Sequence, residues 1–237
     1  MGTDPHATRM RSETSELFKA LAHAAPVAVI TGRSVHDVRH RLDHASLLAV
    51  IGNHGAEPSP FARRAAREVK AWMPALKAVV ATLPGVEIED KGQSVSVHYW
   101  HSPNPATATG AMESLAPTLP HRVRLVHGIG LVNLIPYGAP DKGDAVRTLV
   151  HEHQLHGALF VGDELTDEAA FRVALELGGI GVRVGKWRES AANFHIATQL
   201  DIEALLTELV IGVTRPRRAT GVADVSPAGA PDGVGAV

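Results

Sequence analysis

The stretch FVGDELTDE, residues 160–168, decides the fold class of this chain. The apolar run 158–161 leads directly into four carboxylates within six residues, the first of which is Asp163. Short, continuously apolar runs are typical of parallel strands that are covered on both faces, and ligands bind beyond the carboxyl ends of such strands. The stretch therefore predicts an α/β protein with an oxygen-rich site at the end of one strand.

Clustered carboxylate oxygens suit Mg²⁺, which takes one or two carboxylates and fills its other positions with water or phosphate oxygens. The alternative is that Thr166, Asp167 and Glu168 only stabilise the start of the next helix, because acidic groups favour the positive end of the helix dipole. That alternative leaves Asp163, at the strand edge, without a role. We therefore predict a metal site that includes Asp163.

Two other segments offer groups that bind anions. The apolar run 27–30 is followed by Thr31-Gly32-Arg33-Ser34, which supplies a hydroxyl, backbone N–H groups and a helix start. Loops of this composition are also common as simple turns. Lys142 lies in the first turn of a predicted helix, where the dipole disfavours a cation, so that a phosphate-holding role is indicated. A solvated surface lysine is the alternative.

The apolar spacing divides the chain into an outer α/β part and an inserted part. Helical and strand patterns alternate up to residue 58 and again from residue 137, whereas residues 59–136 show a long helix and strands with one polar face. We predict a discontinuous α/β core, residues 1–58 and 137–214, with an inserted α+β module at 59–136. Residues 215–237 are rich in Gly, Pro and Ala and are predicted to form a disordered tail.

The composition excludes several classes of protein. The 237 residues are 45% hydrophobic and 20% charged, which is typical of a globular protein, and no cysteine is present for thiol or disulfide chemistry. With 25 acidic and 23 basic residues, the charge gives no support for nucleic-acid binding. No apolar run is long enough to cross a membrane, and the N-terminus lacks a secretory or lipidation signal. We therefore expect a cytoplasmic protein without a nucleic-acid or membrane partner.

Several short sequence motifs resemble those of the trehalose-6-phosphate phosphatase family of the haloacid dehalogenase superfamily. The two most specific motifs are GNHGAE, residues 52–57, and GDELTDE, residues 162–168. VAVITGRS, EDKGQSVSVHY, DKGDAV and GIGVRVG match as well, and the resemblance spans roughly residues 5 to 212. The resemblance implies a Rossmann-like core with an inserted α+β cap. It also implies a phosphoric monoester hydrolase that uses Mg²⁺ to convert trehalose 6-phosphate into trehalose and phosphate in trehalose biosynthesis.

The resemblance implies roles for individual residues. Thr31 orients the phosphoryl group, Lys142 neutralises its charge, and Asp163 binds Mg²⁺ with Asp167 in close support. The implied partner is a small-molecule sugar phosphate, while a partnership with a trehalose-6-phosphate synthase is left open. The implied substrate-binding residues are Gly32, Arg33, Asn53, His54, Lys91 and His98.

The chain departs from the family in three places. Members of the family begin with an apolar strand that ends in the motif Asp-x-Asp-Gly-Thr, whose first Asp attacks phosphorus. In this chain only Gly2-Thr3 matches that motif. We therefore expect the central strand and the nucleophile to be missing and the chain as written to be inactive. A misplaced start site or a truncated gene is favoured over a genuine pseudoenzyme.

The other two departures are Trp100, where Arg is usual, and Asn133, where a sugar-binding Glu is usual. Trp100 could stack on a sugar or simply pack. Both positions leave open a phosphatase for another sugar phosphate, and the absent nucleophile leaves open a catalytically inactive protein that binds phosphosugars or regulates another protein.

Overall fold

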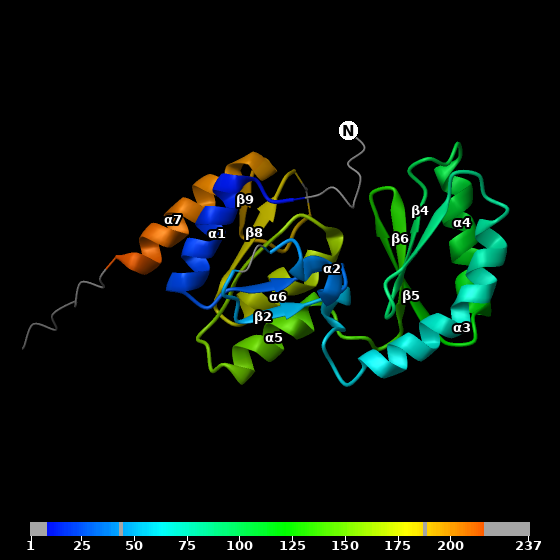
Figure 1. The fold of residues 1–237 in the computed structure, drawn as a ribbon, viewed down its shortest axis with the longest axis horizontal. Helices are drawn as coiled ribbons and strands as arrows, with labels where there is room; N and C mark the ends of the chain where they lie inside the picture. Colours follow the sequence, from blue (N-terminus) through cyan, green and yellow to red (C-terminus); the bar gives the residue numbers. More distant parts are fainter. Residues whose placement is uncertain (1–8, 43–44, 187–188, 216–237) are drawn as a thin grey trace, which may run out of the picture.

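The computed structural model describes residues 9–42, 45–186 and 189–215. Figure 1 shows an α/β unit built from both ends of the described chain, with a second unit from its middle standing beside it. We call the first unit the core and the second, residues 62–136, the cap. The core contains α1 (Ser12–Ala24), β1 (Ala28–Ile30), α2 (Val35–Arg39), β2 (Ala49–Ile51), η1 (Asn53–Gly55), α5 (Lys142–Glu152), β7 (Leu159–Gly162), η3 (Leu165–Asp167), α6 (Glu168–Glu176), β8 (Ile180–Val184), β9 (Phe194–Ile196), η4 (Gln199–Asp201) and α7 (Ile202–Thr214).

All strands of the core are parallel, which confirms the predicted α/β class. β1 pairs with β2, with Val29 opposite Val50. β8 lies between β7 and β9 in a second sheet, with Val161 opposite Val182. The loops that follow β1 and β2 therefore leave their sheet at the same end, and α5 contacts both η1, which follows β2, and η3, which follows β7.

The two parallel sheets share helical layers but are not joined to each other. Ile30 of β1 and Phe160 of β7 pack on one apolar cluster with residues of α5 and α6. α1 and α7 contact each other, and the Thr14 hydroxyl donates to Glu203 at 2.6 Å. Within the described residues, no backbone hydrogen bond links β1 or β2 to β7, β8 or β9. In that part of the chain, β1 and β7 thus each keep one edge without a strand partner.

The cap is an antiparallel sheet covered by two helices. Its strands are ordered β3-β4-β6-β5. Among the described helices of cap and core, none is both long and apolar enough to cross a membrane. The cap contains α3 (Ala62–Val80), β3 (Glu87–Asp90), β4 (Val95–His98), α4 (Pro105–Leu115), η2 (Ala116–Thr118), β5 (Val123–Gly128) and β6 (Leu131–Pro136).

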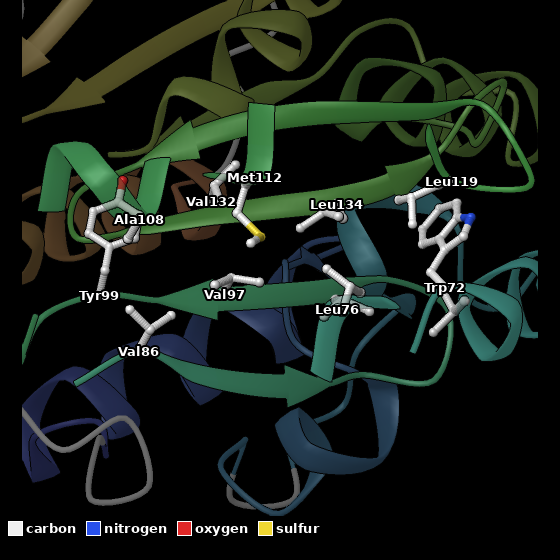
Figure 2. Packing of buried hydrophobic residues seen from close by; sticks show 12 residues of the cluster. Trp72, Leu76, Val86, Val97, Tyr99, Ala108, Met112, Leu119, Val132 and Leu134 are labelled. Atoms are coloured by element: carbon white, nitrogen blue, oxygen red, sulfur yellow. The ribbon is translucent and has the colours of Figure 1, made fainter. Parts of the chain in front are cut away.

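One face of the cap sheet packs on α3 and α4 (Figure 2). Trp72 and Leu76, one turn apart on α3, have no exposed surface, and they share a cluster with Met112 of α4 and with Val97 and Leu134 of the sheet. Burying each large apolar side chain contributes about 1.5–3 kcal/mol. The helical spacing of these residues therefore fixes α3 to the sheet.

The opposite face of the cap sheet is largely polar and meets the core. Residues directly opposite one another in a sheet share a face, so Glu89, Ser96 and Asn133 line this face on three neighbouring strands. The Ser96 hydroxyl donates to Oδ1 of Asn133 at 2.5 Å. Ile135, two residues further along the same face, packs on Ala56 of the core. This contact presents the polar face of the cap to the loops at the strand ends.

Candidate functional site

The candidate site lies where the loops beyond β1, β2 and β7 meet the start of α5. The N–H of His54, in the loop after β2, donates to the carbonyl of Thr31, in the loop after β1, at 2.9 Å. Lys142, the first residue of α5, binds Asp167 of η3 at 2.7 Å. Four motifs that lie far apart in the sequence thus come together in the structure, namely those that contain Thr31, His54, Lys142 and Asp167.

Lys142 is held as a cation by two carboxylates. Its side chain is 5% exposed, and Nζ donates to Oδ1 of Asp167 at 2.7 Å and to Oε2 of Glu164 at 3.3 Å. Burial alone would lower the pKa of Lys142, but the carboxylates of Glu164 and Asp167 raise it above its ordinary value. An ammonium group has three N–H donors, so one remains for a ligand oxygen.

Asp167 supports Lys142 through contacts that use both of its oxygens. Oδ1 accepts from Lys142, and Oδ2 accepts the N–H of Glu164 at 2.8 Å. A Cβ on Gly162 would overlap the Asp167 carboxyl group, which explains the glycine before the acidic run. In this arrangement Asp167 positions Lys142. Coordination of a metal by Asp167 stays a prediction.

The loop after β1 presents a hydroxyl next to the loop that carries His54, whose N–H donates to the carbonyl of Thr31. Oγ1 of Thr31 accepts the N–H of Arg33 at 3.2 Å and donates to no group of the described residues, so its proton is available to a ligand. The hydroxyl of Ser34 accepts the N–H of Asp37 at 3.2 Å and caps the start of α2, as predicted. The guanidinium of Arg33 is bound to Asp37 at 2.7 Å, and substrate binding by Arg33 stays a prediction.

Asn53 connects the core to the cap. Its Nδ2 donates to Oε2 of Glu57 at 2.8 Å, and its Oδ1 accepts the hydroxyl of Ser94, a cap residue, at 2.9 Å. The same Glu57 oxygen accepts the N–H of Val35, the first residue of α2, at 2.9 Å. Asn53 is completely buried, and these contacts fix the loop after β2. A direct contact of Asn53 with substrate stays a prediction.

His54 is buried but has no hydrogen-bond partner for its ring. The residue is 4% exposed, and neither Nδ1 nor Nε2 has a partner among the described residues. Its ring lies so close to Gly32 that a Cβ there would be 2.5 Å from Cε1 of His54, so only glycine fits. Burial, followed by the charges of Lys142 and Lys91, lowers the pKa of His54 to about 3. A neutral imidazole therefore faces this site.

The predicted cap residues Lys91 and His98 lie on either side of Glu89. Nε2 of His98 is 2.9 Å from Oε2 of Glu89, and Nζ of Lys91 is 3.7 Å from the same oxygen. Burial lowers the pKa of Lys91 despite the opposing charges of Glu89 and Glu164. Because Glu164 belongs to the core, this mutual influence places the Lys91 end of the cap next to the acidic loop.

Asp163 lines a cavity of about 450 Å³ together with Val161, Met10 and Gln199. Its Oδ2 accepts from Nε2 of Gln199 at 3.2 Å. Burial and the nearby carboxylates of Glu164 and Asp167 raise the pKa of Asp163, and a cation would relieve this excess of negative charge. No group of three or more His, Cys, Asp or Glu in the described part of the chain is arranged to hold a metal. Asp163 therefore fits the small protein share of a Mg²⁺ shell that water and phosphate complete.

We expect Asp163→Asn to weaken Mg²⁺ binding at least about tenfold, because the ion loses the charge of one of few protein ligands. Isothermal titration of Mg²⁺ into the folded protein measures this change. Glu176→Gln is the matched control, since Glu176 pairs with Arg147 on the protein surface. Unchanged Mg²⁺ affinity in Asp163→Asn would remove the metal assignment.

Three residues of the site are not among those singled out from the sequence. Glu164 and Ser94 hold Lys142 and Asn53, and Arg124 of β5 is close enough to His54 for its charge to lower the pKa of that residue. Glu164 belongs to the acidic run, which marks the loop but not the contact. Arg124 follows the alternation of a strand with one polar face, a pattern that does not distinguish a site residue from a solvated one.

The two unusual cap residues take different places. Asn133 is buried and accepts the Ser96 hydroxyl on the face that meets the core. Trp100 is 56% exposed, and its ring lies against Gly130 in the turn between β5 and β6. This packing leaves part of the Trp100 ring accessible, so sugar stacking by Trp100 stays a prediction.

Comparison with known proteins agrees with this architecture. The chain is similar to the trehalose-6-phosphate phosphatase of Escherichia coli, with 27% identity over 84% of this chain and 76% of that protein. It is 33% identical to a probable trehalose-phosphate phosphatase of Sinorhizobium fredii over 67% of this chain and 62% of the relative. The solved C-terminal domain of the Candida albicans trehalose-6-phosphate phosphatase superposes with a TM-score of 0.77 at 19% identity, covering 89% of this chain and 88% of the other.

The sequence profile of one family also matches most of the chain. The trehalose-phosphatase profile covers residues 1–199, and this range includes the loops of Thr31, His54, Lys142 and Asp163 as well as the whole cap. The match thus spans both units and every segment that meets at the candidate site, from which it follows that this chain belongs to the trehalose-phosphatase family.

Proposed function

We propose that this chain binds trehalose 6-phosphate between core and cap, for hydrolysis to trehalose and phosphate. The observation that carries the proposal is Lys142, a buried cation with one free N–H beside the Thr31 loop at the ends of the parallel strands. The E. coli and S. fredii relatives are named as phosphatases of trehalose phosphate. A magnesium requirement and a cytoplasmic location belong to the same proposal.

The phosphoryl group is the part of the substrate that the core residues suit. Phosphoryl transfer depends mainly on positioning and on neutralising charge that spreads over the phosphoryl oxygens. The Thr31 hydroxyl donates to one oxygen, and Lys142 donates its remaining N–H to another. Because Asp167 and Glu164 fix the ammonium before the substrate arrives, Lys142 needs little rearrangement to act.

Asp163 would hold Mg²⁺ in this site, and the ion would supply charge stabilisation to the phosphoryl oxygens. The other residues act without it: Gly32 gives the His54 ring its place, and Asn53 and Glu57 fix the loop that carries His54. The polar cap face supplies hydrogen-bonding groups for the sugar, of which Lys91 and His98 are the proposed contacts.

The attacking oxygen has no assigned residue in this proposal. Thr31, Lys142 and Asp163 are assigned to phosphate and metal, and within the described residues β1 pairs only with β2 and β7 only with β8. This observation favours a second candidate function, a protein that binds a phosphosugar without hydrolysing it. The two functions share one binding site and differ in turnover.

Substrate preference tests the assignment to trehalose 6-phosphate. We expect the 237-residue chain to bind trehalose 6-phosphate at least about tenfold more tightly than glucose 6-phosphate, a difference of about 1.4 kcal/mol, because only the disaccharide reaches the cap. Titration calorimetry with both ligands in the presence of Mg²⁺ measures the ratio. Equal affinities would indicate a site for another sugar phosphate, as Trp100 and Asn133 leave open.

A further inference from the structure

Arg124 lies on the cap face that meets the core. It is opposite Ile135 in the pairing of β5 with β6, and residues opposite one another point to the same side of a sheet. Ile135 and Val126, two positions from Arg124 on its own strand, pack with Ala56 of the loop after β2. β5 also lies beside η3, the acidic loop of the core. Arg124 is therefore directed toward the candidate site and away from the apolar interior of the cap.

Arg124 is a half-buried cation without a counterion. It forms no hydrogen bond or ion pair with any residue of the ranges that the structure describes. The other arginines near the site are engaged, since Arg33 binds Asp37 at 2.7 Å and Arg183 binds Glu168 at 3.2 Å. A guanidinium that is partly withdrawn from water is stabilised by an anion, and it keeps its charge at every physiological pH. Its position and charge thus call for a negatively charged ligand.

His54 of the core is a second polar group of the site without a partner within the described residues. It is a buried imidazole whose two ring nitrogens have no partner within the described residues, although polar groups buried in proteins are nearly always hydrogen-bonded. Its backbone has φ of 59°, in the left-handed region, and its N–H donates to Thr31, so the backbone that carries the ring is held in place. Lys142, Lys91 and Arg124 are the cations close enough to affect it. A ligand that enters among these cations would lie beside the His54 ring.

We propose that Arg124 of the cap and His54 of the core form one ligand-binding subsite, in which Arg124 binds the substrate phosphate and His54 hydrogen-bonds an adjacent sugar oxygen. The subsite rests on the proposed function and adds to it the cap residue that reads the phosphate. Arg124 can form two parallel N–H bonds to phosphate oxygens, whereas Lys142 of the core acts as a point charge. Because its two halves belong to different units, the subsite is complete only when cap and core are together.

Affinity measurements on the 237-residue chain test whether Arg124 binds the phosphate group through its charge. We expect Arg124→Gln to weaken the binding of trehalose 6-phosphate and of inorganic phosphate at least about tenfold, because a hydrogen bond to a charged group is lost. The same substitution is expected to change the affinity for trehalose less than about twofold. Arg122→Gln is the matched control, because Arg122 lies two residues away and stacks on Tyr137 at 3.9 Å. An equal loss for trehalose, or no loss for either anion, overturns the assignment.

A double-mutant cycle tests whether the two residues share one ligand. His54→Phe keeps a ring against Gly32 without nitrogens, and His54→Gln restores a donor. We expect His54→Phe to weaken trehalose 6-phosphate and trehalose alike, His54→Gln to recover part of the loss, and the double variant with Arg124→Gln to be non-additive. Strict additivity, or equal affinities of the Phe and Gln variants, contradicts a shared subsite. Failure of the unmodified chain to bind trehalose 6-phosphate would instead contradict the proposed function itself.

Discussion

Joining an apolar strand that ends in Asp-x-Asp to the N-terminus of this chain is expected to raise phosphate release from trehalose 6-phosphate by at least about a thousandfold, because loss of a nucleophile typically costs several orders of magnitude. The strand would lie between β1 and β7, whose edges have no strand partner within the described residues. Its first Asp would then follow the strand beside the loops of Thr31 and Asp163. Assays of Mg²⁺-dependent phosphate release from both proteins give the ratio.

The matched control for this experiment is the same extension ending in Asn-x-Asn. That version supplies the backbone and the apolar side chains of the strand without a nucleophile, so it is expected to raise stability and leave turnover low. Rapid turnover by the 237-residue chain, or by the Asn-x-Asn version, would contradict the account. Asp4 would then be the first residue to replace in a search for another nucleophile.

Lys142→Met is expected to have the second large effect, a loss of phosphate and vanadate affinity of about 10- to 100-fold with little change for trehalose, because the charge serves the phosphoryl group. The same substitution leaves Asp167, whose side chain is 5% exposed, without its counterion. Removing one partner of a buried pair commonly destabilises a protein by about 3–5 kcal/mol. Titration of the three ligands and urea denaturation measure the two effects.

A double variant separates these effects of Lys142. Lys142→Met with Asp167→Asn removes both charges of the pair, so it is expected to recover much of the stability of the single variant while phosphate binding stays weak. Recovery of phosphate affinity together with stability would show that Lys142 acts only on the fold. A parallel loss of affinity for trehalose would lead to the same conclusion.

The sequence predicts most elements of the fold because their apolar patterns are strong. The strands at β1 and β7 are continuously apolar, and α3 repeats large side chains at helical spacing, with Trp72 and Leu76 fully buried. β9 is not predicted, because Phe194 and His195 are exposed on a three-residue strand that has neither a continuous nor an alternating pattern. Its pairing with β8 depends on the surrounding sheet.

The sequence predicts where the candidate site lies, but it predicts few of the contacts between the residues of the site. Asp163 and Thr31 are predicted as site residues because each follows an apolar strand, and ligands bind beyond the carboxyl ends of parallel strands. The contact between Lys142 and Asp167 depends on how α5 and η3 pack, which no local pattern records. For the same reason the sequence does not show that the side-chain amide of Asn53 is already hydrogen-bonded to Glu57 and Ser94.

A crystal structure of the 237-residue chain with trehalose 6-phosphate and Mg²⁺ would show whether core and cap bind one phosphosugar between them. We expect the phosphoryl group within hydrogen-bond distance of Oγ1 of Thr31 and Nζ of Lys142, the metal on Asp163, and the sugar against the polar face of the cap. A phosphosugar bound elsewhere, or a phosphoryl group that contacts neither Thr31 nor Lys142, would contradict this expectation.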